Sequence, residues 1–229
     1  MEKPVYKEKL RVRSYQPAGP DDPVFVELKK KYKSVVYKRR LVLPEAQVMK
    51  CFEHGKPLPI HSQIGEEIAY FWDYYETLHP TVFLTYEREA YYALDGSDFR
   101  VTFDENILYR EEDISLGSKI YGTPILGENQ TLMEIKTSGG IPLWMSETLT
   151  KNTLFKTSFS KYGTAYQQMM DDAIEEAQEN GVTVYRDIDK SKFIEAVQPM
   201  HEAFESKGDA YKSLYEDIQK YAVAEEEEK

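Results

Sequence analysis

Basic side chains alternate with apolar ones in several short segments of the sequence. Arg11 and Arg13 flank Val12, and because residues i and i+2 of a β-strand share a face, the two arginines are expected to project together. Four further segments show the same spacing, in the sets Glu27/Lys29, Tyr86/Arg88, Arg100/Thr102/Asp104 and Glu134/Lys136. Lysine and arginine neutralise phosphate groups, and arginine does so with paired contacts. The pattern therefore suits a surface that holds a chain of phosphates.

The charged faces of these strands allow two interpretations. In an open sheet they would simply face solvent. However, the charged positions are mostly Lys or Arg with isolated Glu, and the strands are numerous for one small sheet without a second apolar layer. A closed barrel with charge inside and apolar residues outside accounts for both features, so we favour a tunnel.

One carboxylate inside such a tunnel indicates a metal. Phosphate would repel a carboxylate unless a divalent cation bridged them, and Glu134 is the best candidate ligand, with Mn²⁺ or Mg²⁺ as the metal. Phosphoryl transfer needs mainly positioning and charge neutralisation, so no nucleophile–base triad is required. The sequence contains neither a GxxxxGK[ST] loop nor a GxGxxG segment.

The chain reads as strands followed by helices, which gives an α+β fold. Strands are predicted at 10–15, 24–31, 35–42, 81–91, 99–104 and 131–136, with a further candidate at 154–159 and a short β-like piece at 182–185. Asp95-Gly96 predicts a hairpin turn. Helices are predicted at 44–52, 63–78, 164–179, 189–206 and 211–224.

Charge is distributed unevenly along the chain. The net charge is −11, yet residues 1–50 contain 13 Lys/Arg against 6 Asp/Glu, whereas residues 165–229 contain 7 against 17. This change of character predicts a boundary near residue 168, between a basic β-rich part (1–168) and an acidic helical appendage (169–229). The single cysteine and the lack of a signal or membrane-spanning segment suggest a cytoplasmic protein. The basic run 29–33 could bind nucleic acid, but a solvated edge is favoured and no nucleic-acid partner is expected.

Seven segments in order resemble the VTC domain, the polyphosphate polymerase branch of the triphosphate tunnel metalloenzymes. The resemblance covers roughly residues 1–168. Its segments read KLRVRSY (9–15), VFVELKKKY (24–32), VVYKRR (35–40), TYEREAY (85–91), FRVTFD (99–104), LMEIKTSGGIPLW (132–144) and FSKYGTAY (159–166).

The resemblance implies an antiparallel β tunnel with packed helices that binds ATP or triphosphate and polyphosphate, and that transfers the ATP γ-phosphate with a divalent metal. It implies catalytic roles for Arg11, Arg13 and Lys161, and metal binding for Glu134. The phosphate-binding residues that it implies are Arg11, Arg13, Lys29, Lys38, Arg88, Arg100, Ser160 and Lys161.

Members of that family carry further strands before the segment at 9–15, so the resemblance implies a tunnel truncated at its N-terminus and leaves catalysis open. The alternatives are a polyanion-binding or regulatory module without catalysis, and a nonfunctional chimera. Residues 171–221 resemble the C-terminal helices of DctP-type solute receptors of TRAP transporters, without their solute-binding lobes.

Overall fold

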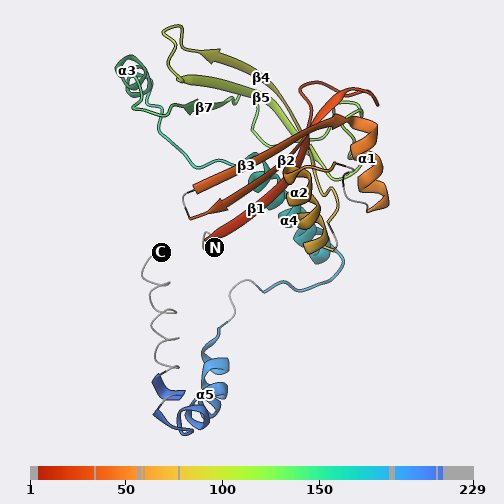
Figure 1. Ribbon diagram of the computed structural model, residues 1–229. Coiled ribbons are helices and arrows are strands. Elements are labelled where there is room, and N and C mark those ends of the chain that lie inside the picture. The colour runs from red at the N-terminus through yellow and green to blue at the C-terminus, as the bar shows by residue number, and fades with distance from the viewer. Residues whose placement is uncertain are drawn as a thin grey trace. The chain divides into compact units, whose positions relative to one another are not determined.

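The computed structural model describes residues 5–33, 35–55, 58, 60–76, 78–185, 189–209 and 211–213. The chain divides into two compact units, residues 1–170 and 171–229. The described residues of the first unit form two antiparallel sheets, three helices and the start of a fourth, so the predicted α+β class is confirmed (Figure 1). No described helix is long and apolar enough to cross a membrane.

The first sheet, sheet A, consists of β1 (Tyr6–Arg13), β2 (Pro23–Tyr32) and β3 (Val35–Pro44) in that order. All neighbours are antiparallel, and the register places Glu27 of β2 between Arg11 of β1 and Arg40 of β3. Since side chains alternate across a strand, these three residues share one face of the sheet. The same face carries Lys29, which lies between Lys9 and Lys38.

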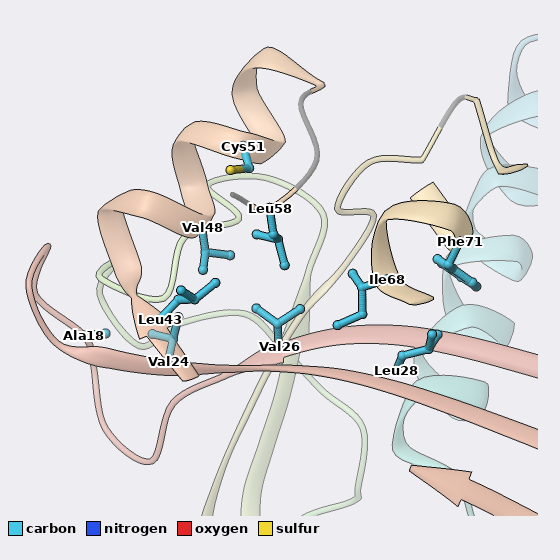
Figure 2. Packing of buried hydrophobic residues seen from close by; sticks show 10 residues of the cluster. All are labelled: Ala18, Val24, Val26, Leu28, Leu43, Val48, Cys51, Leu58, Ile68 and Phe71. Atoms are coloured by element: carbon cyan, nitrogen blue, oxygen red, sulfur yellow. The ribbon is translucent and has the colours of Figure 1, made fainter. Parts of the chain in front are cut away.

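The opposite face of sheet A forms the main hydrophobic core. Val24, Val26 and Leu28 are almost completely buried there, against α1 (Glu45–His54) and α2 (Gln63–Tyr74). Figure 2 shows the side chains of both helices directed at these strand residues. Burial of this face removes apolar surface from water and stabilises the fold, and the charged side chains lie on the opposite face of the sheet.

The start of α2 is held close to the preceding chain. The hydroxyl of Ser62 accepts a hydrogen bond from the Gly65 amide, as an N-cap residue does. A Cβ atom at Gly65 would lie 2.3 Å from the Ile60 carbonyl oxygen. Only glycine allows this approach, which fixes α2 over sheet A.

The second sheet, sheet B, is built around β5 (Arg100–Arg110). β4 (Phe83–Tyr92) pairs with one edge of β5, whereas β6 (Thr123–Pro124) and β7 (Leu132–Lys136) pair with it at other positions. The predicted hairpin turn between β4 and β5 is confirmed, and Gly96 adopts a positive φ of 79° there. One face of this sheet packs on α3 (Leu143–Lys151) through Met145.

Helix α4 (Lys161–Glu179) begins three residues earlier than predicted. Ala165 of this helix is fully buried against Ile107, Tyr109 and Ile125 of sheet B and its neighbours. The ring of Tyr162 lies 4.3 Å from the ammonium group of Lys9 on sheet A. The first turns of α4 therefore contact both sheets.

Several predictions about the fold are wrong. Sheets A and B have separate strand ladders within the described residues, so the antiparallel sheets do not close into a barrel. Residues 154–159 and 182–185 form no strand, because they pair with no strand in the described part of the chain. Helix α3 and the two-residue β6 were not predicted. In the second unit α5 (Ser191–Glu205) matches the predicted helix at 189–206. Of the helix predicted at 211–224, residues 211–213 are helical and 214–224 lie outside the described residues.

Candidate phosphate-binding site

A single buried carboxylate organises the charged face of sheet A. Glu27 is 2% exposed and forms ion pairs with four basic side chains from β1 and β3. Its Oε2 atom lies 2.5 Å from Arg11 Nη2, and its Oε1 atom lies 2.6 Å from Arg40 Nη2. Lys38 Nζ and Arg13 Nε follow at 3.2 and 3.5 Å from Oε1. Glu27 thereby links the three strands of the sheet.

The charge on this face is strongly positive. Eight basic residues share it with Glu27, namely Lys7, Lys9, Arg11, Arg13, Lys29, Lys31, Lys38 and Arg40. Within the described part of the chain, no ion pair with a carboxylate joins Lys9 or Lys29. Because one carboxylate cannot neutralise eight cations, the face attracts anions.

The pKa values of two groups on this face reflect the crowding of charge. Burial raises the pKa of the Glu27 carboxyl, but the hydrogen bonds and charges of Arg11, Lys38 and Arg40 outweigh it and hold the pKa at about 2. Loss of solvent around the Lys9 ammonium, and repulsion from Arg11 and Lys29, lower its pKa to about 8. Glu27 is thus ionised at neutral pH, whereas Lys9 titrates at a pH only slightly above neutrality.

Sheet B contains a second carboxylate centre of the same design. Asp104 of β5 is fully buried and receives two hydrogen bonds from Arg88 of β4, at 2.5 Å (Nε to Oδ1) and 2.7 Å (Nη2 to Oδ2). The ammonium group of Lys161, at the start of α4, pairs with Asp104 Oδ2. Burial raises the pKa of Asp104, but Arg88 and Lys161 lower it below its usual range. Arg88 and Lys161 also lie over the ring of Tyr86, at 5.1 and 4.7 Å.

Glu134 lies on β7 beside this centre, opposite Thr102 of β5. Its side chain is 41% exposed, with Oε1 2.9 Å from Lys136 Nζ and Oε2 3.7 Å from Arg88 Nη2. Burial raises the pKa of Glu134, but the positive charges of Lys136, Arg88 and Lys161 outweigh this effect, so the pKa lies below its usual value. Glu134 is therefore an accessible, ionised carboxylate surrounded by cations.

Glu134 fits a metal site of one particular kind. No cluster of three or more His, Cys, Asp or Glu side chains that could hold a metal occurs among the described residues. Mg²⁺ and similar hard cations are commonly held by one or two carboxylates together with substrate phosphates and water. Glu134 can supply the single protein oxygen for such a site, which would form only with a bound phosphate chain.

Two predicted residues lie at the margins of these centres. Arg100 faces Lys136 across the β5–β7 ladder, its Nε atom is buried without a hydrogen-bond partner in the described residues, and its guanidinium lies 5.7 Å from the Tyr92 ring. Ser160 caps α4, because its Oγ accepts a hydrogen bond from the Gly163 amide. Its hydroxyl proton remains able to donate to an anion.

The structure thus gathers the predicted residues into two groups. Arg11, Arg13 and Lys38 surround Glu27, with Lys29 beside them, whereas Arg88 and Lys161 bind Asp104 next to Glu134. The site prediction missed both buried carboxylates, and also Lys9, Arg40 and Lys136. Spacing had already placed Glu27, Asp104 and Lys136 on charged faces, without a role in the site. The same alternation places Lys9 and Arg40 on the charged face of sheet A.

Comparison with known proteins agrees with the resemblance for most of the chain. The search among curated proteins finds no match. The family model of the VTC domain matches residues 1–170, which include both sheets and the start of α4. The match does not extend to the second unit, where the resemblance to TRAP solute receptors stays a prediction. The chain belongs to the VTC domain family.

Proposed function

We propose that this protein binds the triphosphate of ATP and a polyphosphate chain on its two basic centres, and that it transfers the ATP γ-phosphate to the polyphosphate with Mn²⁺ or Mg²⁺. The observation that carries the proposal is the excess of ordered cations around Glu27 in a domain of a family related to polyphosphate polymerases. ATP as the donor favours a cytoplasmic location.

The roles of the residues follow from the chemistry of phosphoryl transfer. The reaction needs the phosphates aligned and their developing charge neutralised, and little proton transfer. Arg11, Arg13 and Lys161 would act on the reacting phosphates. Other cations and the Ser160 hydroxyl would hold the remaining phosphates, namely Lys29, Lys38, Arg88 and Arg100. The metal, held by Glu134 and phosphate oxygens, would neutralise charge on the transferred group.

A second candidate function is a polyanion-binding module without catalysis. The position of Glu134 favours it, because Lys136 and Arg88 already neutralise this carboxylate. Such a module would bind polyphosphate without any requirement for a metal.

Calorimetric titration with inorganic tripolyphosphate in the presence of Mn²⁺ tests the proposal. The double variant Arg11→Ala/Arg13→Ala should lose about a hundredfold or more in affinity, since two charge-assisted contacts disappear. Arg39→Ala is the matched control, because Arg39 belongs to the same sheet but pairs with Glu67 away from the Glu27 centre. A wild-type protein that does not bind tripolyphosphate would overturn the proposal.

Incubation with ATP and short polyphosphate, followed by gel analysis of chain length, separates the two candidates. Growth of the chain supports the polymerase. Tight binding of polyphosphate without any growth supports the noncatalytic module.

A further inference from the structure

The charged face of sheet A ends in aromatic side chains. Phe25 of β2 lies two residues before Glu27 on the same face, and in the strand register it stands opposite Arg13. Tyr15 lies two residues after the end of β1, and its ring meets that of Phe25 edge to face, with 5.3 Å between the ring centres. At this end of the sheet the face thus changes from cations to aromatic rings.

Two arginines of the basic face belong to this aromatic end, the proposed phosphate ligand Arg13 and its neighbour Arg40. The Arg13 guanidinium lies 4.9 Å from the Tyr15 ring centre, and its Nη2 atom donates a hydrogen bond of 2.8 Å to the Tyr15 hydroxyl. The Arg40 guanidinium lies 4.9 Å from the Phe25 ring. Both arginines also contact Glu27, so the rings adjoin the cationic centre.

The exposure of Tyr15 distinguishes this ring from a packing residue. Tyr15 is 75% exposed, although its hydroxyl and its neighbours hold it in place. The hydrophobic core of sheet A lies on the opposite face and does not include it. A held but exposed ring is suited to stack on a planar ligand.

We propose that Tyr15, supported by Phe25, is the stacking site for the base of a nucleoside triphosphate whose phosphates lie on Arg13, Arg40 and the neighbouring cations. The inference rests on the proposed function, because it takes the phosphates of the nucleotide to occupy the basic face of sheet A. The charge complementarity of arginines and phosphates sets the direction of the ligand, with the base at the aromatic end. Polyphosphate lacks a base and does not use the ring.

Stacking makes little distinction between bases, since every base presents a π-face. ATP and GTP are therefore expected to bind with affinities within about threefold of each other. ATP should bind more tightly to the wild-type protein than inorganic tripolyphosphate does.

Titration of ATP and tripolyphosphate, each with Mn²⁺, against wild-type protein and three variants tests the site. Tyr15→Ala should lower the affinity for ATP by about fivefold or more, and change the affinity for tripolyphosphate by less than about twofold. Tyr15→Phe keeps the ring and should keep the ATP affinity. Tyr37→Ala is the control, because Tyr37 is an exposed tyrosine of the same sheet, in the register of the opposite face.

The outcomes separate this inference from the proposed function. If Tyr15→Ala leaves ATP binding unchanged, or weakens both ligands equally, the stacking site is overturned while the phosphate site stands. If wild-type protein does not bind tripolyphosphate, the proposed function fails. Loss of ATP affinity in Tyr15→Phe would assign the effect to the hydroxyl and overturn stacking.

Discussion

The guanidinium of Arg40 lies 2.6 Å from a carboxylate oxygen of Glu27, which is only 2% exposed. Arg11, on the other neighbouring strand, binds the second carboxylate oxygen. The cations of sheet A are therefore held in position before any anion arrives. Such preorganisation reduces the conformational entropy that a phosphate chain must remove on binding.

Glu27→Gln should lower the free energy of unfolding by about 1–3 kcal/mol at pH 7, because the cations would then repel one another without their counter-charge. The pKa of Glu27 is about 2 in the folded protein, well below the usual value of 4.5. Its stabilising effect is thus complete above about pH 4.5 and is lost as the pH falls towards 2. Denaturant unfolding at pH 7 and pH 3 should show the difference between variant and wild type shrinking on acidification.

Glu66→Gln is the control for this experiment, because Glu66 is exposed on α2, and α2 packs on the apolar face of sheet A opposite the charged one. It should change the free energy of unfolding by less than about 0.5 kcal/mol. A Glu27→Gln protein as stable as wild type at pH 7 would show that Glu27 does not hold the cations.

The strands of sheet A could be predicted from the sequence, but the ion pairs between their side chains could not. Alternation predicted that Arg11 and Arg13 share a face, and the three strands of sheet A occur close to the predicted positions. Alternation could not show that Glu27 forms ion pairs with basic side chains of both neighbouring strands, because strand order and register decide which side chains meet. For the same reason Lys161, 57 residues after Asp104 in the sequence, could not be paired with it from spacing.

The barrel prediction failed for a related reason. A charged face and an apolar face on each strand are equally compatible with a closed tunnel and with two open sheets, each covered by helices on its apolar side. Here α1 and α2 cover sheet A, and α3 packs on sheet B. Closure depends on hydrogen bonds between strand edges, which side-chain alternation does not encode.

Asp104→Asn should weaken tripolyphosphate binding about tenfold, even though it removes a negative charge from the site. Arg88 and Lys161 lose the buried partner that fixes them, and this loss of positioning should exceed the electrostatic gain. Glu89→Gln removes an equal charge from an exposed residue of β4 whose register position is on the other face, and should leave affinity the same or slightly higher. Tighter binding by Asp104→Asn would contradict a positioning role.

Glu134→Gln should abolish the stimulation of tripolyphosphate binding and of any phosphate transfer by Mn²⁺. It removes the accessible carboxylate beside Asp104, and leaves Lys136 and Arg88 free to contact phosphate. Binding without metal should therefore stay unchanged or increase. Titrations with and without Mn²⁺ measure both effects, with Glu147→Gln on α3 as the control. Equal responses to Mn²⁺ in wild type and Glu134→Gln would exclude Glu134 as a metal ligand.

Lys9 should make phosphate binding sensitive to pH just above neutrality. Its pKa is lowered to about 8, so the free protein loses this positive charge as the pH rises from 7 to 9. A bound polyanion favours the protonated ammonium and raises its pKa, so binding near pH 8 should take up a proton. The affinity for tripolyphosphate should fall by about three- to tenfold between pH 7 and pH 9.

Calorimetry at pH 8 in two buffers of different ionisation enthalpy measures this proton uptake directly. Lys9→Met should bind more weakly at pH 7, and should show neither the uptake nor the pH dependence. Lys7→Met is the matched control, because Lys7 lies two residues earlier on the same face of β1, yet outside the crowded group of Arg11 and Lys29. If Lys9→Met takes up as much proton as wild type does, another group titrates in the site and Lys9 does not contact the phosphate chain.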